Sequence, residues 1–315
     1  MDEIIASKPG RGEFWDVVVA GSGPSGLTAA IYTTRGSAST LVLGGEKWGG
    51  QLMLTTEVDN FPGFPEGIMG PTLMANMRKQ AERFGAEFVE KNVESIKRIK
   101  SLFEITAGGE KYLAKSIIIA TGAATQWLKL DGIEKLIGRG ISSCAPCDAP
   151  FFRDKKVAVV GGGDSAMEEA SVLTKYASDV FIIHRKNEFR ASAAMQKKVL
   201  DNPKIKILWN SEVIKVIGEK KLEKIIVLNN QTSKKEELML DGLFVAIGYK
   251  PESDVFKKIV ATDERGYIVI QNGSKANVPG IFVSGDVHDY TYKQAVTAAG
   301  YGCQAGMEAL KYLEK

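Results

Sequence analysis

Short apolar runs and stretches of helical spacing alternate along the chain, and this order predicts a mixed α/β protein. A β-branched run at Asp16–Ala20 predicts a buried strand, which a glycine turn, a helix and a second strand at Thr40–Leu43 follow. The same succession recurs between strands predicted at Val157–Val160 and Val180–Ile183. Other apolar and polar stretches predict buried strands that end at Thr121–Gly122, Gly248 and Gly285–Asp286, and a hairpin with Asn229 and Asn230 near its turn.

Both turns have the G-x-G-x-x-G spacing of dinucleotide-binding units. Their residues are Gly21, Gly23 and Gly26 in the first turn, and Gly161, Gly163 and Ala166 in the second. A diphosphate approaches the backbone closely only where side chains are small, and a helix N-terminus offers it free N–H groups. Two copies, each between a strand and a helix, predict two nucleotide sites. The alternative is one functional site and one copy retained for packing.

The residues after each second strand indicate which nucleotide binds. The strand of the second unit ends at His184, with Arg185, Lys186 and Arg190 behind it and no acid at the strand end. Cations there suit the 2′-phosphate of NADPH, although a solvated basic loop is the alternative. In the first unit Glu46 lies near the usual position of a ribose-binding acid, but the strand itself ends at Gly44. Because NADPH is assigned to the second unit, the first unit is left for another dinucleotide, and FAD is the natural candidate.

Composition narrows the class of protein. A chain of 315 residues with 44% hydrophobic and 25% charged residues is typical of a soluble protein, and its length favours two domains. The net charge of +3 gives no reason to expect nucleic acid or a membrane surface as partner. No apolar run is long enough to span a membrane, residues 1–13 have no visible role, and three cysteines are too few for a secreted scaffold. We therefore expect a cytoplasmic protein.

Two of the cysteines form a C-x-x-C motif in "SSCAPCDAP". Such a pair can be half of a zinc site, a redox disulfide or an accident. His184 and His288 are the only histidines, so a four-ligand zinc site could not be built from ordinary ligands, and we expect no metal. A flavin that accepts a hydride from a nicotinamide can reduce a disulfide, so two nucleotide sites beside Cys144 and Cys147 favour redox chemistry. Cys303 is expected to be a buried packing thiol, whereas Trp48 and Trp127 either edge the flavin pocket or pack at the surface.

Over residues 15–315 the chain resembles the low-molecular-weight thioredoxin reductases. The matching stretches are "GSGPSGLTAAIY", "GGQLMLTTEVDNFPGFPEGIMGPTLM", "ATGA", "CAPCD", "VVGGGDSAMEEA", "HRKNEFRAS", "GLFVAIG" and "SGDVHDYTYKQAVTAAGYGC". The C-x-x-C lies within the second unit, which separates this family from glutathione-reductase-like enzymes. The sequence departs from the family pattern at Lys186 ("HRR"), Ala149 ("CDG"), Tyr249 ("AIGH") and Lys293 ("YRQA").

The resemblance implies two Rossmann-like, three-layer ββα domains, the second inserted into the first. The FAD domain would comprise residues 1–124 and 252–315, the NADPH domain residues 125–251, and the protein would be a homodimer. Residues 121–125 and 248–253 would be the hinges for a rotation of the NADPH domain. Cys147 would face the flavin, Cys144 would attack the disulfide of thioredoxin or a thioredoxin-like protein, and Asp148 would act as an acid.

Cofactor contacts are expected in both units. In the first unit and the C-terminal segment they are Gly21, Gly23, Pro24, Ser25, Gly26, Gly50, Gln51, Asn60, Thr121, Gly122, Gly285, Asp286, Lys293, Gln294 and Ala295. In the second unit they are Gly161, Gly163, Asp164, Ser165, Ala166, His184, Arg185, Lys186 and Arg190. The resulting hypothesis is an NADPH-dependent thioredoxin-disulfide reductase. The rival hypotheses are an oxygen-using dithiol oxidase and a non-catalytic flavin redox sensor.

Overall fold

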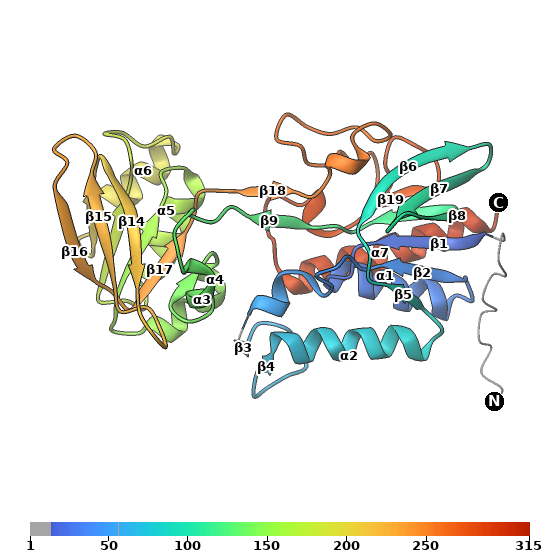
Figure 1. Ribbon diagram of the computed structural model, residues 1–315, viewed down its shortest axis with the longest axis horizontal. Coiled ribbons are helices and arrows are strands. Elements are labelled where there is room, and N and C mark those ends of the chain that lie inside the picture. Colours follow the sequence, from blue (N-terminus) through green and yellow to red (C-terminus); the bar gives the residue numbers. More distant parts are fainter. Residues whose placement is uncertain (1–13, 56) are drawn as a thin grey trace. The chain divides into compact units, whose positions relative to one another are not determined.

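The chain forms two compact units in a computed structural model that describes residues 14–55 and 57–315 (Figure 1). Unit 1 contains the chain up to Ala124 together with Lys250–Lys315, and unit 2 is Thr125–Tyr249. The chain crosses between the units along β9 (Ala123–Thr125) and β18 (Tyr249–Pro251), which pair with each other. The second crossing lies two residues before the boundary expected after residue 251. The tail predicted at residues 1–13 lies outside the described residues.

Unit 1 is built on a seven-stranded sheet in the order β5-β2-β1-β8-β7-β6, with β19 on β8. The parallel part contains β1 (Trp15–Ala20), β2 (Thr40–Leu43), β5 (Glu87–Val89), β8 (Glu110–Ile119) and β19 (Ile281–Val283). The strands β6 (Val93–Ile99) and β7 (Leu102–Ala107) continue the sheet in antiparallel fashion from β8. Short elements complete the unit: β3 (Glu57–Val58), β4 (Ile68–Met69), and the 3-10 helices η1 (Gly50–Leu54), η3 (Asp254–Phe256) and η4 (Gly285–Val287).

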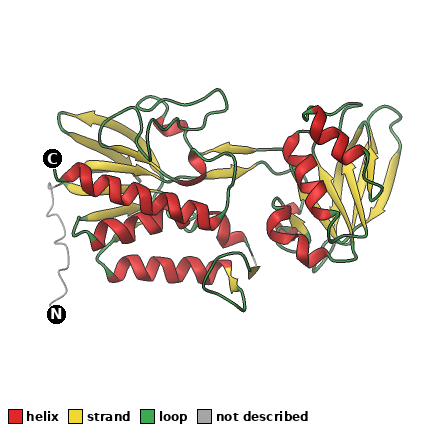
Figure 2. Cartoon of the chain, turned by 180° about the vertical axis from the view of Figure 1, so that it is seen from behind, coloured by secondary structure: helices red, strands yellow, loops and turns green. Residues whose placement is uncertain are grey.

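Helices cover one face of this sheet. They are α1 (Pro24–Arg35), α2 (Gly70–Arg83) and α7 (Ala295–Leu313), which Figure 2 shows lying together. Successive residues of a strand point to opposite faces. Accordingly Val17 and Val19 of β1 pack with the helices, while Val18 and Ala20 pack in a second core with β7 and η3. This two-sided burial explains why the strand reads as a continuous apolar run.

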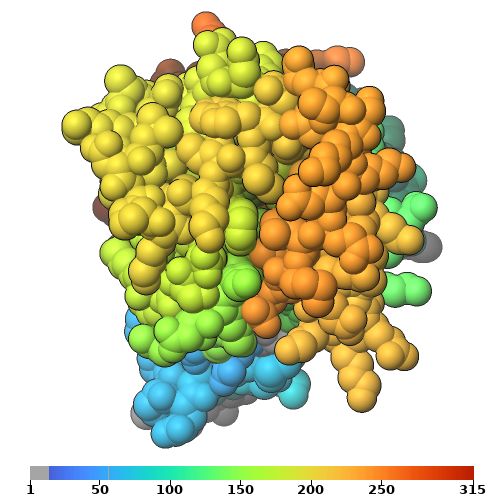
Figure 3. Space-filling view, turned by 90° about the vertical axis from the view of Figure 1, so that its left-hand side faces the viewer, coloured from blue at the N-terminus to red at the C-terminus, as the bar shows by residue number. Residues whose placement is uncertain are grey.

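Unit 2 has three layers. A parallel sheet contains, in order, β10 (Ile141–Ser142), β17 (Gly242–Val245), β11 (Lys156–Val160), β12 (Asp179–Ile183) and β13 (Ile205–Leu208). An antiparallel sheet of β14 (Ser211–Ile217), β15 (Lys224–Asn229) and β16 (Lys235–Met239) packs on one face. Figure 3 views this unit from the side of β16, whose residues lie in the orange part of the surface. The helices are α3 (Ile133–Leu136), α4 (Ala145–Asp148), η2 (Ala149–Phe152), α5 (Asp164–Leu173) and α6 (Ala193–Leu200).

The predicted elements are confirmed with small shifts. The strand expected at Asp16–Ala20 is β1, and the polar hairpin is the β15–β16 pair, whose turn follows Asn229. The runs expected to end at Gly122, Gly248 and Gly285 leave their sheets two or three residues earlier, at Ile119, Val245 and Val283. The ends of these strands lead directly into the candidate site. The three-layer α/β class with Rossmann-like sheets is confirmed.

Candidate functional site

The three glycines of the first glycine turn, which connects β1 to α1, differ in how much space surrounds each of them. Gly21 has φ +112°, and a Cβ on it would lie 2.3 Å from the carbonyl oxygen of Ala120. A Cβ on Gly26 would lie 2.0 Å from the carbonyl oxygen of Gly21, whereas a Cβ on Gly23 would meet no atom within 4 Å. The first and third glycines therefore permit close packing. Gly23 leaves open space at a helix start that has no acidic residue in its first turn.

The second glycine turn repeats this division between β11 and α5. A Cβ on Gly161, whose φ is +156°, would lie 2.4 Å from the carbonyl oxygen of Ala246, and Gly163 again faces open space. Ala166, at the third position, is completely buried. Unlike α1, α5 begins with an acid, Asp164, and its carboxylate accepts hydrogen bonds from the backbone N–H and the hydroxyl of Ser192, both 2.8 Å long.

The hydrogen bonds from Ser192 make Asp164 a link between the start of α5 and the loop before α6. The backbone and hydroxyl bonds from Ser192 hold the pKa of Asp164 below its usual range, so the group is a carboxylate at neutral pH. This carboxylate fastens the loop before α6 to the start of α5. Ser165, the next residue, is exposed at the same helix start. The structure therefore places Asp164 as a support of the predicted nucleotide site.

Predicted FAD residues from distant parts of the chain meet within unit 1. Gly50 has φ +68°, and a Cβ on it would lie 3.4 Å from the Cα atom of Gly23. Ser25 of α1 shares a short hydrogen bond with Ser284, which precedes Gly285, and a Cβ on Gly285 would lie 2.9 Å from the Cβ of Ser25. The loop around Gly50 and the segment around Gly285 thus both reach the start of α1.

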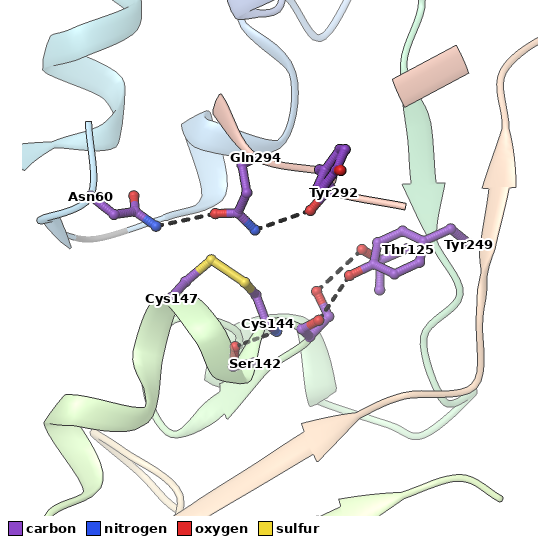
Figure 4. Close-up of a disulfide and its surroundings, with 9 residues drawn as sticks. Asn60, Thr125, Ser142, Cys144, Cys147, Tyr249, Tyr292 and Gln294 are labelled. Carbon is purple, nitrogen blue, oxygen red and sulfur yellow. Dashed lines mark hydrogen bonds between the residues drawn. A yellow bond between two sulfur atoms is a disulfide. The ribbon is translucent and has the colours of Figure 1, made fainter. Parts of the chain in front are cut away.

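The polar side chains of the same region contact one another. Asn60 donates to the amide oxygen of Gln294 at 3.2 Å, and Gln294 donates to the carbonyl of Tyr292 at 3.3 Å (Figure 4). Gln51 donates to the carbonyl of Ala123 at 3.4 Å. Four other residues are predicted FAD contacts. Pro24 begins α1 and Ala295 begins α7. Thr121 donates to the carbonyl of Glu252 at 2.6 Å, and Gly122 has φ +74°.

The carboxylate of Asp286, in η4, has one buried oxygen atom. Among the described residues its Oδ1 atom has no hydrogen-bond partner. Burial, and then the charge of Asp289, raise the pKa of Asp286 to about 7, against the opposing charge of Lys293. Buried polar atoms are rarely left unpaired. A hydroxyl of a bound FAD would satisfy this oxygen, so Asp286, the open position at Gly23 and the acid-free start of α1 together fit such a cofactor.

His288 and Asp289, two neighbours of Asp286, are further candidate site residues that were not predicted from the sequence. The Nε2 atom of His288 and the Oδ2 atom of Asp289 are also buried and without a partner in the described part of the chain. Burial lowers the pKa of His288, whose ring packs edge-on against Tyr301 at 4.6 Å. Lys293 lies close by with φ +48°, and its ammonium donates to the carbonyl of Tyr290 at 2.5 Å. The crowding of charges in "GDVHD" was the available signal.

Cys144 and Cys147 form a disulfide with an S–S distance of 2.07 Å. Cys144 caps α4, and its carbonyl accepts hydrogen bonds from the N–H groups of Cys147 at 3.2 Å and Asp148 at 3.1 Å. The N–H of Cys144 donates to the hydroxyl oxygen of Ser142 at 3.0 Å (Figure 4). These bonds keep the motif in a single tight turn.

Asp148 follows the disulfide directly. Burial raises the pKa of its carboxyl, although a hydrogen bond with the Ser142 hydroxyl opposes this shift. A raised pKa lets a carboxyl hold and release a proton nearer neutral pH. Ala149, where the family pattern has glycine, is completely buried and packs with Ala166 of α5. The departure at Ala149 therefore fills the core between the redox turn and the second glycine helix.

The basic loop after β12 is fastened to the second glycine turn. Its backbone is held by a bond from the N–H of Arg190 to the carbonyl of Gly162 at 2.7 Å. Arg185, Lys186 and Arg190 are exposed, and none of them forms an ion pair within the described residues. Three cations without an acidic partner can receive an anionic group of a ligand.

His184 packs against the basic loop and contacts it through a hydrogen bond and one aromatic ring. It is buried, its Nε2 atom is 2.8 Å from the carbonyl of Glu188, and its ring contacts Phe189 and Trp209. A Cβ on Gly162 would lie 2.2 Å from the His184 ring, so the glycine turn rests on the imidazole. Burial lowers the pKa of His184, which keeps it neutral at pH 7.

Trp48, Trp127 and Cys303 all make packing contacts. Trp48 stacks with the guanidinium of Arg78 at 4.8 Å, and Trp127 packs against the core between the two sheets of unit 2. Cys303 is only half-buried, which corrects the expectation of a buried thiol; its Sγ atom is 3.9 Å from the sulfur of Met307. In the described ranges no three His, Cys, Asp or Glu residues are grouped as metal ligands. No described helix is both long and apolar enough to cross a membrane.

Comparison with known proteins gives a consistent family. Residues 15–302 match the model of the pyridine nucleotide-disulphide oxidoreductase family. A thioredoxin reductase of Streptomyces clavuligerus is 46% identical over 301 residues, which cover 95% of this chain and 94% of that protein. A bifunctional thioredoxin reductase/thioredoxin of Mycobacterium leprae is 45% identical over 95% of this chain and 66% of its own length. The solved thioredoxin reductase of Giardia duodenalis is 38% identical with a TM-score of 0.91, over 96% of this chain and 100% of that one.

Proposed function

Because this chain belongs to the pyridine nucleotide-disulphide oxidoreductase family and, within it, to the thioredoxin reductases, we propose that it reduces the disulfide of thioredoxin or a thioredoxin-like protein with electrons from NADPH. The electrons would pass through FAD and the Cys144–Cys147 pair. The observation that carries this proposal is the closed disulfide, held on a helix that packs against the second glycine helix. The M. leprae relative, named as both reductase and thioredoxin, supports thioredoxin as the partner.

Unit 1 is the proposed FAD site. The diphosphate would lie at Gly23 and the start of α1, where the backbone is open and no acid opposes it. Asp286 would accept a hydrogen bond from a cofactor hydroxyl, and the start of α7 would present its N–H groups. When bound, FAD supplies a two-electron acceptor that takes a hydride and passes the electrons to a disulfide.

Unit 2 is the proposed NADPH site. Gly163 and the start of α5 would receive the diphosphate, and Arg185 and Arg190 would form paired bonds with the 2′-phosphate. Lys186 adds charge without the planar fork of an arginine, so it would contribute attraction more than geometry. The strands β9 and β18 are the proposed hinges, and by resemblance to the family the working form is a homodimer.

The cysteines would act in a fixed order. Two electrons and two protons convert the Cys144–Cys147 disulfide to two thiols, and the raised pKa of Asp148 suits it to hand over one of these protons. Cys144, as thiolate, would attack the substrate disulfide and form a mixed disulfide with one substrate sulfur. Cys147 would then attack Cys144, which releases the substrate as a dithiol and restores the starting disulfide.

Variants of the two cysteines test this order. Cys147→Ser should accumulate a mixed disulfide with a thioredoxin whose single remaining cysteine is activated as a disulfide with thionitrobenzoate. Cys144 attacks the thioredoxin sulfur, thionitrobenzoate leaves, and no resolving thiol remains to break the new disulfide. Cys144→Ser should form none, and both variants should lose NADPH-dependent thioredoxin reduction. The measurements are a non-reducing gel and a turnover assay, with Cys303→Ser as the matched control that keeps full activity. If Cys144→Ser forms the adduct instead, the roles are reversed, and if neither variant loses turnover the motif is not the redox centre.

Anaerobic addition of NADPH to the flavin-loaded protein separates the rival functions. Rapid bleaching of the flavin colour is expected for the reductase, because the basic loop and second glycine turn supply a nicotinamide site. A dithiol oxidase would show no bleaching with NADPH but would consume oxygen when given a dithiol. A redox sensor would do neither.

A further inference from the structure

Ser143, the residue before Cys144, is bonded to both strands that connect the units. Its hydroxyl shares a hydrogen bond of 3.3 Å with the hydroxyl of Thr125, and its carbonyl accepts one of 2.8 Å from the phenol of Tyr249 (Figure 4). Thr125 and Tyr249 are the first and last residues of unit 2. The chain therefore enters and leaves this unit at two residues that each bond to the start of the redox turn.

The two connecting strands are hydrogen-bonded to each other where Thr125 and Tyr249 lie. Next to Thr125, the N–H of Gln126 donates to the carbonyl of Gly248 at 3.0 Å, and β9 pairs with β18. Tyr249 itself is half-buried, so its phenol is partly shielded from competing water. A hydrogen bond that water competes for less contributes more to holding its partners.

The other side of the turn is held separately. The hydroxyl oxygen of Ser142 accepts a hydrogen bond from the N–H of Cys144 at 3.0 Å, and the hydroxyl also bonds to the carboxyl of Asp148. Ser142 therefore connects the two ends of the redox turn. Ser143 ties it to the connecting strands. The backbone that carries Cys144 is thus fixed from two directions in the disulfide form that the structure shows.

We propose that Tyr249, together with Thr125, is a positioning residue that stabilises the disulfide form of the Cys144–Cys147 pair by tying Ser143 to the connecting strands. The stability of an intramolecular disulfide depends on how well the backbone holds the two sulfurs together. Once the sulfur–sulfur bond is reduced, Cys144 is no longer tethered to Cys147, and bonds that fit the closed turn favour the oxidised form. The inference rests on the proposed redox function of this pair.

The test is the thiol–disulfide equilibrium of the flavin-loaded protein with dithiothreitol. Reduced dithiothreitol forms its cyclic disulfide and gives two electrons and two protons to the protein disulfide, which becomes two thiols. Protein is equilibrated without oxygen at set ratios of reduced to oxidised reagent, quenched with acid and labelled with a maleimide. Mass spectrometry then counts the added labels on Cys144 and Cys147.

Tyr249→Phe should shift this equilibrium toward the dithiol by about two- to tenfold, the worth of one neutral hydrogen bond. The matched control is Tyr112→Phe, which removes a phenol that donates to Glu110 at 3.0 Å on β8 of unit 1, and it should leave the equilibrium unchanged. Thr125→Val removes the second bond to Ser143 and should shift the equilibrium in the same direction. It also serves as the test if Tyr249→Phe does not fold.

An equilibrium that is unchanged in a folded Tyr249→Phe protein, or shifted toward the disulfide, overturns the proposal. So does an equal shift in Tyr112→Phe, because the effect would then not depend on Ser143. Dithiothreitol replaces both NADPH and thioredoxin in this measurement. A failure of the proposed function would therefore appear in the turnover assay, and a failure of the Tyr249 proposal in the labelling equilibrium.

Discussion

The two glycine turns have similar backbone surroundings at corresponding residues. Gly21 and Gly161 each lie against the carbonyl of the residue that directly follows a neighbouring strand, so neither position has room for a Cβ. Gly23 and Gly163 both face open space, which a bulky side chain would fill. The turns differ in what surrounds the helix start: uncharged residues at α1, but Asp164 and a basic loop at α5. The side chains, more than the turns, therefore distinguish the two proposed nucleotides.

Replacing Arg185 and Arg190 together with alanine should raise the Michaelis constant for NADPH at least about a hundredfold, because each substitution removes a charge-assisted bond worth about 1.5–3 kcal/mol. The Michaelis constant for NADH, which has no 2′-phosphate, should change little. Steady-state kinetics with both nucleotides measure this. Lys220→Ala/Lys221→Ala, which removes two exposed cations elsewhere in unit 2, is the control and should affect neither constant. Equal effects on NADPH and NADH would argue against a 2′-phosphate site.

Asp286 predicts a pH-dependent stability in the flavin-free protein. Its pKa of about 7 in the folded chain exceeds the ordinary 3.8, so the folded state holds the proton more tightly than the unfolded state. Folding stability from this group is therefore present below pH 4 and is lost as pH rises to about 7. At about 1.4 kcal/mol per pH unit, the loss is at most about 4 kcal/mol.

Asp286→Asn removes this titration. Thermal unfolding should show the variant equal to the wild type near pH 4 and increasingly more stable toward pH 8. Asp201→Asn is the control, because Asp201 lies at the exposed end of α6 in an exposed ion pair with Lys197. A difference between Asp286→Asn and wild type that does not grow with pH would show that burial does not set the protonation of this carboxyl.

At the scale of elements, α1 and α7 pack closely because α7 has small residues where the helices meet. A Cβ on Gly302 would lie 2.2 Å from the carbonyl oxygen of Ser25, and one on Gly306 would lie 2.9 Å from the Cβ of Tyr32. Ser25 is in the first turn of α1. The contact between the two helices therefore also sets where the start of α1 stands relative to the proposed FAD site.

Gly302→Ala should destabilise the protein by about 1–3 kcal/mol, because the new methyl group meets backbone atoms and forces the helices apart. Gly300→Ala in the same helix should instead stabilise it by about 0.5–1 kcal/mol, since nothing lies within 4 Å of that position and alanine favours helix. Urea unfolding of both variants measures the pair, and flavin content should fall in Gly302→Ala alone. Similar effects of the two substitutions would contradict the packing argument.

At the scale of the whole molecule, unit 2 has what an independent domain needs. It contains two cores, one on each face of its parallel sheet, and its chain ends lie side by side at Thr125 and Tyr249. A segment with its own core and adjacent ends generally folds by itself. Residues 125–249 expressed alone should therefore unfold cooperatively on heating. Circular dichroism checks this, and a gradual, non-cooperative melt would show that the unit depends on the rest of the chain.

The sequence alone determined the features that depend on local spacing. Strand, glycine turn and helix could be predicted in both units, because apolar periodicity and backbone freedom act over a few neighbouring residues. The same holds for the redox pair Cys144 and Cys147, which are three residues apart and close into a disulfide within one turn. The resemblance to the family rests on these motifs in their order, and the comparisons confirm the family.

The tertiary structure decided what depends on contacts between distant segments. Asp286 has its raised pKa because folding buries it beside Asp289, and Tyr249 reaches Ser143, 106 residues earlier, because the connecting strands pair. Asp164 is a predicted nucleotide contact at the start of α5, and only the folded chain shows that its carboxylate also accepts hydrogen bonds from Ser192, 28 residues later. No local pattern encodes these contacts, since burial and long-range pairing arise only when the sheets bring remote residues together.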